Sequence, residues 1–247
     1  MLKVILSPAK RLTFRKDETL TMSKPLFINE ATQINFELKD LSVNALKDLM
    51  GISLDLANLN WQRYQEWSPQ GAYAAGFCFD GEAYRGLDIR GFSPEKLKVA
   101  QEKLYILSGM YGLLKPLDAI SPYRLEMGTP ISINHHKNLY DFWSEKIAHQ
   151  LNKELGKGVL VNVTSEEYFK VINRKKLESR VINCFFKDFK DGKLKTLVVY
   201  TKKARGAMAR FIIENNIQNP EELKLFNTDH YAFDDSLSTE NDFVFTR

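Results

Sequence analysis

Three short apolar segments constrain the fold of this chain more than any other feature of its sequence. They are Leu2–Leu6 (LKVIL), residues 104–107 (LYIL) and Val159–Val163 (VLVNV). Their length and branched side chains are typical of buried strands, and helical patterns lie between them. No internal repeat, low-complexity tract or Pro- and Ser-rich linker marks a boundary. We therefore predict one α/β-type domain of mixed α and β structure over residues 1–247.

The remaining elements are predicted from capping residues, helical spacing and turn signals. The predicted helices cover residues 41–50 with Ser42 as N-cap, residues 54–67, a segment opened by Ser93 and Pro94, residues 138–155 and residues 202–216. Residues 180–186 and 194–200 are predicted to form a hairpin around Asp191 and Gly192. Residues 242–246 are predicted to form a closing strand.

Composition excludes several classes of protein. The chain is 44% hydrophobic and 27% charged, which is unlike a disordered protein, and it has two distant cysteines, unlike a disulfide-rich secreted module. We expect Cys78 and Cys184 to be buried thiols in a cytoplasmic protein. No apolar run is long enough to span a membrane. The motifs GxxxxGK[ST], GxGxxG, GxSxG, HExxH and CxxC are all absent, so we predict no cofactor and no metal site.

Charge is distributed unevenly along the chain, although the net charge is only +4. Residues 170–210 contain thirteen Lys or Arg and three Asp or Glu, whereas residues 211–246 contain one Lys and eight acids. Clustered positive charge is typical of proteins that bind polyanions, because each neutralised phosphate releases counterions. The alternative is a solvated basic face that the acidic segment offsets in space.

A glycine turn between two predicted helices indicates one possible DNA contact. Met50, Gly51, Ile52, Ser53 and Ala57 occupy the positions of a helix-hairpin-helix within about residues 42–67. In that motif the N–H groups of a helix N-terminus hold a DNA phosphate without reading bases. Ser53 stands where the motif usually has a second glycine. An ordinary helical hairpin with Gly51 as C-cap is the alternative.

Further cations are candidates for the same partner. Lys202, Lys203 and Arg205 lie in the first turns of a predicted helix, where they oppose the helix dipole unless an anion binds there. Arg210 lies farther along that helix. Lys10 follows the first strand, at the place where α/β folds usually bind ligands. A solvated basic helix is the alternative for the helical cations.

A second group of polar residues indicates a possible pocket. Tyr123, Arg124 and Glu126 belong to a structured loop that is rich in glycine and proline, and Asn162 and Glu166 lie at the end of the VLVNV segment. These five residues are the candidates for an active site if the protein acts on a nucleotide or nucleic acid. The alternative is that the charged members only form salt bridges with each other.

The chain resembles the YaaA family of bacterial peroxide-stress-resistance proteins. The resemblance rests on SPAK (7–10), LSGMYGLLKPLD (107–118), PYRLEMG (122–128), LYDFW (139–143), SEEYFK (165–170), KKARGAMARFIIEN (202–215) and FNTDHYAFDD (226–235), in family order. It implies a cytoplasmic protein that limits iron-driven peroxide damage, with an α/β fold peculiar to the family, a helix-hairpin-helix and a positively charged DNA-binding cleft. It assigns no catalytic residue.

Together these features favour a DNA-binding protein of the hydrogen peroxide response. It would hold double-stranded or branched DNA through Gly51, Ile52, Ser53, Lys10, Lys202, Lys203, Arg205 and Arg210, without regard to base sequence. The alternative is an enzyme that uses the five pocket residues. Iron sequestration is disfavoured because His and Cys do not cluster, although Asp229, Asp234 and Asp235 are possible oxygen ligands.

Overall fold

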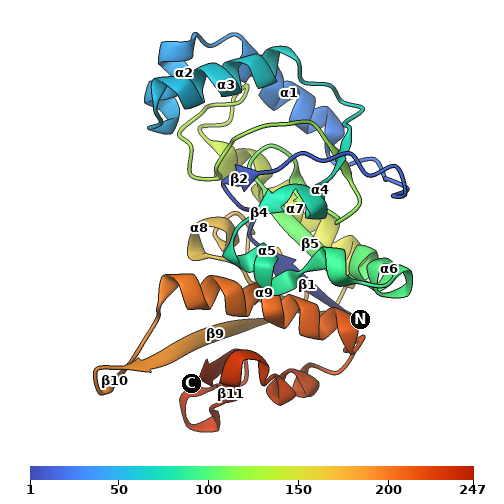
Figure 1. The fold of residues 1–247 in the computed structure, drawn as a ribbon, viewed down its shortest axis with the longest axis vertical. Helices are drawn as coiled ribbons and strands as arrows, with labels where there is room; N and C mark the ends of the chain where they lie inside the picture. Colours follow the sequence, from blue (N-terminus) through green and yellow to red (C-terminus); the bar gives the residue numbers. More distant parts are fainter.

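A mixed β-sheet forms the centre of the computed structural model, which describes residues 1–247 (Figure 1). Its strands lie in the order β11-β12-β9-β8-β1-β5-β6, and β10 pairs with β9. Strands β5, β1, β8, β9 and β12 are parallel, and the others are antiparallel to their neighbours. The strands are β1 (Leu2–Leu6), β5 (Leu104–Ser108), β6 (Gly112–Leu114), β8 (Val159–Val163), β9 (Arg180–Lys190), β10 (Lys193–Lys195), β11 (Ala232–Phe233) and β12 (Asp242–Thr246).

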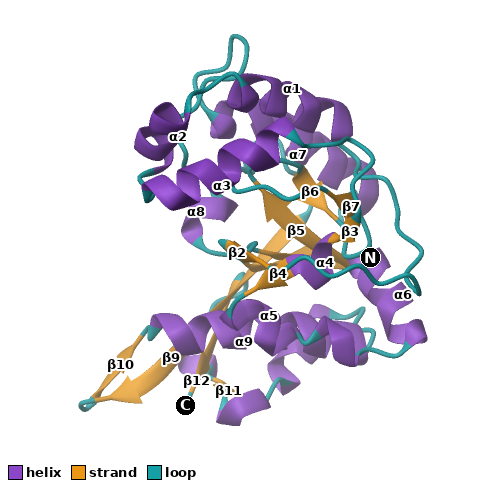
Figure 2. Ribbon diagram, turned by 45° about the horizontal axis from the view of Figure 1, so that its top comes forward, coloured by secondary structure: helices purple, strands orange, loops and turns teal.

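Nine α-helices surround this sheet, and two small ribbons lie beside it. The helices are α1 (Ile28–Lys39), α2 (Val43–Met50), α3 (Leu54–Gln65), α4 (Ala75–Cys78), α5 (Glu82–Leu87), α6 (Pro94–Lys103), α7 (Leu139–Leu155), α8 (Glu166–Phe169) and α9 (Val198–Glu214). The ribbons pair β2 (Arg11–Leu12) with β4 (Phe79–Asp80), and β3 (Tyr73–Ala74) with β7 (Ala119–Ile120). Figure 2 shows α5 and α9 together on one side of the sheet, while α1, α2 and α3 gather at the far end.

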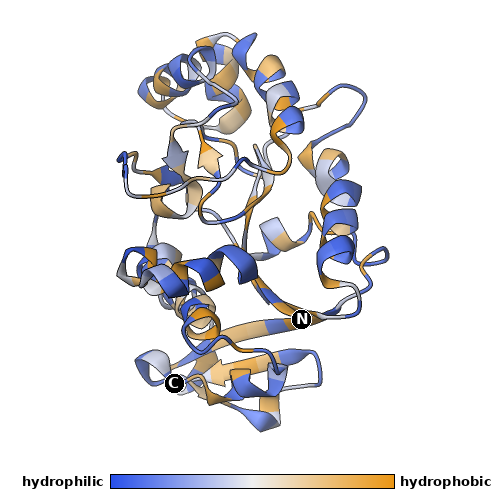
Figure 3. Cartoon of the chain, turned by 90° about the vertical axis from the view of Figure 1, so that its right-hand side faces the viewer, coloured by the Kyte–Doolittle hydropathy of each residue, from blue (hydrophilic) through white to orange (hydrophobic).

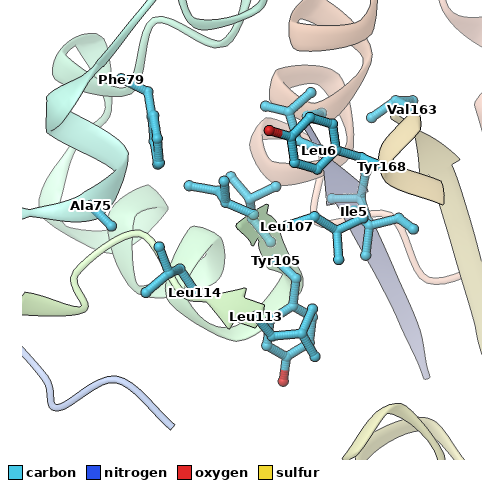
Figure 4. Close-up of a cluster of buried hydrophobic side chains, with 14 of the residues drawn as sticks. Ile5, Leu6, Ala75, Phe79, Tyr105, Leu107, Leu113, Leu114, Val163 and Tyr168 are labelled. Carbon is cyan, nitrogen blue, oxygen red and sulfur yellow. The ribbon is translucent and has the colours of Figure 1, made fainter. Parts of the chain in front are cut away.

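The apolar segments of the sequence become the core strands. All five residues of β1 are buried, since β1 lies between β5 and β8 and is covered on both faces. Figure 3 shows apolar residues along the strands and mixed polar and apolar faces on the helices. Ile5, Leu6, Leu107 and Val163 meet in one cluster where β1, β5 and β8 lie side by side (Figure 4).

The order of the parallel strands creates a switch point. Along the chain they occur as β1, β5, β8, β9 and β12, but in space the order is β5-β1-β8-β9-β12. The chain therefore adds β5 on one side of β1 and all later parallel strands on the other side. In open α/β sheets a crevice forms outside the carboxyl ends of the two strands where the direction of winding reverses, and ligands bind there. In this protein those strands are β1 and β8.

The structure confirms most of the predicted elements. The three apolar segments are strands, Asp242–Thr246 is a strand, and Asp191 and Gly192 form the turn of the β9–β10 hairpin. Ser42 and Ser93 cap their helices through side-chain hydrogen bonds as predicted, and Ser53 and Asn138, for which no cap was predicted, do the same.

Two predicted boundaries are wrong, and they concern the same segment. Residues 194–200 were expected to be a strand, but β10 ends at Lys195 and α9 begins at Val198. The β-branched residues Val198 and Val199 favour a strand locally, but both are exposed residues of the first turn of α9, ahead of the part of the helix that contacts α5. Lys202, Lys203 and Arg205 consequently lie beyond the first turn of α9, so the expected conflict with the helix dipole is much weaker.

Both cysteines are free and buried, as the sequence predicts. Burial raises the pKa of the Cys78 and Cys184 thiols to about 12. None of the helices combines the length and apolar character needed to cross a bilayer.

Candidate functional site

A cavity of about 550 Å³ lies outside the carboxyl ends of β1 and β8, at the switch point of the sheet. Four parts of the chain line this switch-point cavity. They are the segment after β1, the start of α5, the segment after β8, and Lys202 and Arg205 of α9. The cavity therefore occupies the position at which a sheet of this topology is expected to bind a ligand.

Hydrogen bonds hold the two strand ends together at the base of this cavity. The backbone N–H of Ser165, which follows β8, donates to Ser7 Oγ over 2.8 Å. The hydroxyl of Tyr84 in α5 donates to the carbonyl oxygen of Ser7 over 3.1 Å. Because Ser7 directly follows β1, these bonds position the loops of both strands and α5 relative to one another.

Close packing of α5 against α9 fixes the opposite wall. A Cβ atom added at Gly206 would lie 1.7 Å from the carbonyl oxygen of Ala83, and one added at Gly86 would lie 2.0 Å from that of Lys203. Any side chain at either position would push the two helices apart. The glycines therefore let α9 approach closely enough for Lys202 and Arg205 to reach the cavity.

Most charged groups around the cavity are paired, but two cations are not. Arg11 pairs with Asp80 over 2.5 Å, Arg85 pairs with Glu82 over 2.5 Å, and Lys10 pairs with Glu126 over 2.5 Å. Lys202 and Arg205 form no ion pair. Glu167 also lines the cavity and forms no ion pair, so two unpaired cations and one unpaired carboxylate leave the cavity with a small net positive charge.

Arg205 is the more unusual of these two residues. Its Nε is buried and has no hydrogen-bond acceptor, and burial without a nearby carboxylate lowers its pKa. Leaving a buried charged donor without a partner costs on the order of a few kcal/mol. Groups with strongly perturbed environments in a cavity are candidates for function, because nothing in the fold itself compensates for their cost.

The residues predicted to bind DNA do not all lie together. Lys10, Lys202 and Arg205 line the switch-point cavity. Lys203 pairs with Asp229 over 2.9 Å. Arg210 is fully engaged, since it pairs with Glu214 and Asp88 and donates to two carbonyl oxygens at the end of α5.

Gly51, Ile52 and Ser53 connect α2 to α3 at the far end of the molecule from α9 (Figure 1). Gly51 is a left-handed C-cap with φ of 60°. Ser53 has φ of −66° and caps α3, so serine fits this position without backbone strain. The first turn of α3 also carries Asp55, whose carboxylate opposes an anion at this helix end.

The five predicted pocket residues do not converge on one cavity. Tyr123 is buried and its hydroxyl hydrogen-bonds Ser108, while Arg124 pairs with Glu126 over 2.7 Å. These three residues lie with Lys10 in a narrow crevice beside the switch-point cavity. Asn162 is bonded to Asn183, and Glu166 is exposed. The candidate iron ligands Asp229 and Asp234 are occupied by an ion pair and by helix capping.

Sequence reasoning missed several residues of the cavity. Ser7, Tyr84, Arg85 and Tyr168 line it but were not selected. The position of Ser7 at a strand end was a usable signal, because the ends of parallel strands meet at one edge of a sheet. The sequence of α5 carries no motif that would have revealed its role.

A second positively charged feature is the tip of the β9–β10 hairpin, which we call the basic arm (residues 187–195). Figure 1 shows it extending past the rest of the molecule. Lys187, Lys190 and Lys193 of the arm have no acidic partner, whereas Lys195 pairs with Asp191. Phe189 on the arm is 66% exposed, so the arm also presents an aromatic ring to solvent.

The root of the basic arm is fixed by a buried ion pair. Asp188 is buried and accepts a hydrogen bond from Arg247 Nε over 2.5 Å and from the Tyr231 hydroxyl over 3.2 Å. The Arg247 guanidinium also lies over the ring of Tyr200, 4.5 Å from its centroid. The arm is therefore anchored to both β12 and α9, although its tip is free.

Known proteins match this chain along nearly its whole length. The family model described as "Peroxide stress protein YaaA" matches residues 2–237. A UPF0246 protein of Flavobacterium psychrophilum is 48% identical and one of Flavobacterium johnsoniae is 46% identical, each with both chains fully covered. A UPF0246 protein of Burkholderia mallei is 44% identical over 99% of this chain and 98% of its own. On this similarity, the chain belongs to the YaaA family of peroxide stress proteins.

Proposed function

We propose that this member of the YaaA family acts in the hydrogen peroxide response by binding double-stranded or branched DNA without reading its sequence. The observation that carries the proposal is the number of unpaired cations in the basic segment. Of its thirteen Lys and Arg side chains, eight form no ion pair: Lys170, Arg174, Lys175, Lys187, Lys190, Lys193, Lys202 and Arg205. If this were only a solvated basic face neutralised by nearby Asp and Glu side chains, fewer of these cations would be without an ion-pair partner.

The basic arm is the principal contact in this proposal. A two-stranded ribbon of this kind fits a DNA groove, and its lysines would neutralise backbone phosphates. Phe189 and Leu194 are opposite each other in the hairpin register, so they share one face of the ribbon. The next pair, Lys190 and Lys193, points to the opposite face. The exposed apolar groups would contact sugars and bases from one face, while these lysines contact phosphates from the other.

Lys202, at the switch-point cavity, is a further unpaired cation of the same basic segment. Two other predicted contacts contribute less. Arg210 is occupied within the protein, and Lys203 shares its charge with Asp229. Gly51, Ile52 and Ser53 would make a separate phosphate contact at the distant α3 N-terminus, where Asp55 weakens it.

Gel-shift titrations over a series of salt concentrations test this proposal. Wild type should bind duplex and junction DNA with an affinity that falls steeply as salt rises. The variant Lys190→Glu/Lys193→Glu should bind more weakly, and its salt dependence should fall by about 0.9 log units for each lost phosphate contact. The matched control Lys98→Glu/Lys153→Glu changes the net charge equally but on α6 and α7, and it should bind like wild type.

Equal affinity and equal salt dependence for the arm variant and wild type would contradict the role of the arm. Tight binding that ignores salt would contradict the proposal as a whole. Survival of cells in hydrogen peroxide then connects binding to the stress response, because the arm variant should protect less than the control variant. The enzyme alternative has no comparable support, since its five candidate residues line no common cavity.

A further inference from the structure

We propose that the switch-point cavity is a binding site for a nucleoside phosphate, with Arg205 contacting the phosphate group. The site is separate from the basic arm and does not depend on duplex binding. Three features of the structure support it: the unpaired charge, the mixed lining of the cavity and its place in the fold.

The charge indicates an anionic ligand. The carboxylates Asp80 and Glu82 are already paired with Arg11 and Arg85 at the rim. Glu167 accepts a hydrogen bond from the backbone N–H of Gly128 over 3.2 Å and pairs with no cation. Arg205 has no acceptor in the protein, and a guanidinium binds phosphate oxygens through two parallel hydrogen bonds. An incoming phosphate would supply the partner that the fold omits.

The lining indicates that the phosphate carries a larger, flat group. A cavity of about 550 Å³ is far larger than a phosphate ion needs and lies in the ordinary range for small organic ligands. Its inner wall is apolar, because Leu6, Val163 and Tyr168 lie together there (Figure 4). The hydroxyls of Ser7 and Ser165 add polar groups on one side. A charged end with a flat, partly polar body describes a nucleotide.

The position in the fold supports the same ligand. Open α/β sheets bind nucleotides at the switch point because the loops after the two diverging strands leave a crevice between them. Here that crevice is closed on its third side by α9, which carries Arg205. The ligand can reach the cavity as a free nucleotide or as an unstacked nucleotide of a DNA strand, and its phosphate chemistry is the same in both cases.

Calorimetric titration of the full chain tests the proposal with defined probes. Wild type should bind dAMP at least tenfold more tightly than deoxyadenosine or inorganic phosphate. In Arg205→Gln this preference for dAMP over deoxyadenosine should disappear, and in Arg205→Lys it should be partly restored. A variant that had only lost structure would bind both dAMP and deoxyadenosine more weakly. The same Arg-to-Gln change at exposed Arg174, outside the cavity, should leave dAMP binding unchanged.

A second variant tests the shape of the cavity without touching its charge. Ala9→Leu adds volume beside Gly81, whose added Cβ would lie 3.3 Å from that of Ala9, and it should weaken dAMP and deoxyadenosine binding alike. The proposal is overturned if dAMP binds no better than inorganic phosphate, or if Arg205→Gln binds dAMP as wild type does.

Competition experiments distinguish the two sources of the nucleotide. A single-stranded oligonucleotide that displaces dAMP in wild type indicates a nucleotide within a strand, and failure to displace it indicates a free nucleotide. The arm variant Lys190→Glu/Lys193→Glu should still bind dAMP. The proposal of nucleotide binding at the cavity and the proposal of DNA binding by the arm can therefore be refuted or supported independently.

Discussion

The ion pair between Lys3 and Glu154 should contribute measurably to stability, and its contribution should depend on pH in a definite direction. Lys3 lies in the central strand β1 with a side chain that is 8% exposed, and Glu154 lies near the end of α7 with a side chain that is 20% exposed. Burial alone would raise the pKa of Glu154, but hydrogen bonds from Lys3, Tyr105 and Gln150 and the charge of Lys3 outweigh it and lower that pKa from 4.5 to about 2.

The magnitude follows from this difference in pKa. At about 1.4 kcal/mol per pH unit, a fall of about 2.5 units corresponds to about 3 kcal/mol of stability at neutral pH. Because the folded pKa is depressed, this contribution is present above pH 4.5 and is lost as the pH falls toward 2. Glu154→Gln should therefore lower the free energy of unfolding by about 3 kcal/mol at pH 7, and by progressively less in acid.

Urea unfolding at pH 7, 4 and 3, followed by circular dichroism, measures both effects. The double variant Lys3→Met/Glu154→Leu is the control. It removes the charge that the single variant leaves buried, so it should recover much of the loss. A cost below about 1 kcal/mol at pH 7, or a cost that stays the same at pH 3, would refute the low pKa of Glu154 and the stability derived from it.

Three other variants test separate parts of the structure. Gly206→Ala places a Cβ atom 1.7 Å from a backbone oxygen of α5, so it should lower the free energy of unfolding by about 3 kcal/mol or more, as measured by thermal and urea unfolding. In the control Gly128→Ala, the added Cβ atom meets nothing closer than 3.4 Å, so stability should change little. Arg247→Gln leaves the buried Asp188 carboxylate without its cation and should cost about 3 kcal/mol, with faster amide exchange at the root of the basic arm as the second readout. Burial raises the pKa of Asp118 from 3.8 to about 6. The contribution of the protonated side chain to stability is therefore present below pH 4 and is lost as the pH rises through 6. In urea titrations, the free energy of unfolding of wild type should fall by about 3 kcal/mol between these pH values, relative to that of Asp118→Asn.

Elements with a local signal could be predicted from the sequence. The strands Leu2–Leu6 and Val159–Val163 are apolar except for Lys3 and Asn162, because both their faces are covered. The caps Ser42 and Ser93 satisfy backbone N–H groups of their own helices. Such features depend on a few neighbouring residues. The body of α9 instead packs against α5, more than a hundred residues earlier in the chain, and its exposed first residues Val198 and Val199 favour a strand locally.

The candidate site could be predicted only in part, for the same reason. Lys10, Lys202 and Arg205 were selected as cations near strand ends or on one helix, and they do line one cavity. No spacing in the sequence indicates that Arg210 is occupied by Asp88 or that Gly51 lies far from α9. Both facts are set by tertiary contacts, and a single sequence contains no direct record of which distant residues pair.

The burial of the two thiols has a consequence for a protein whose family is named for peroxide stress. Hydrogen peroxide reacts with the thiolate form of cysteine, so reactivity follows thiol pKa and access. With a pKa of about 12, only about one thiol in 10⁵ is ionised at neutral pH. Cys78 and Cys184 are therefore protected from the oxidant for as long as the fold is intact. Oxidation of either cysteine should therefore be much faster in the unfolded chain than in the folded one.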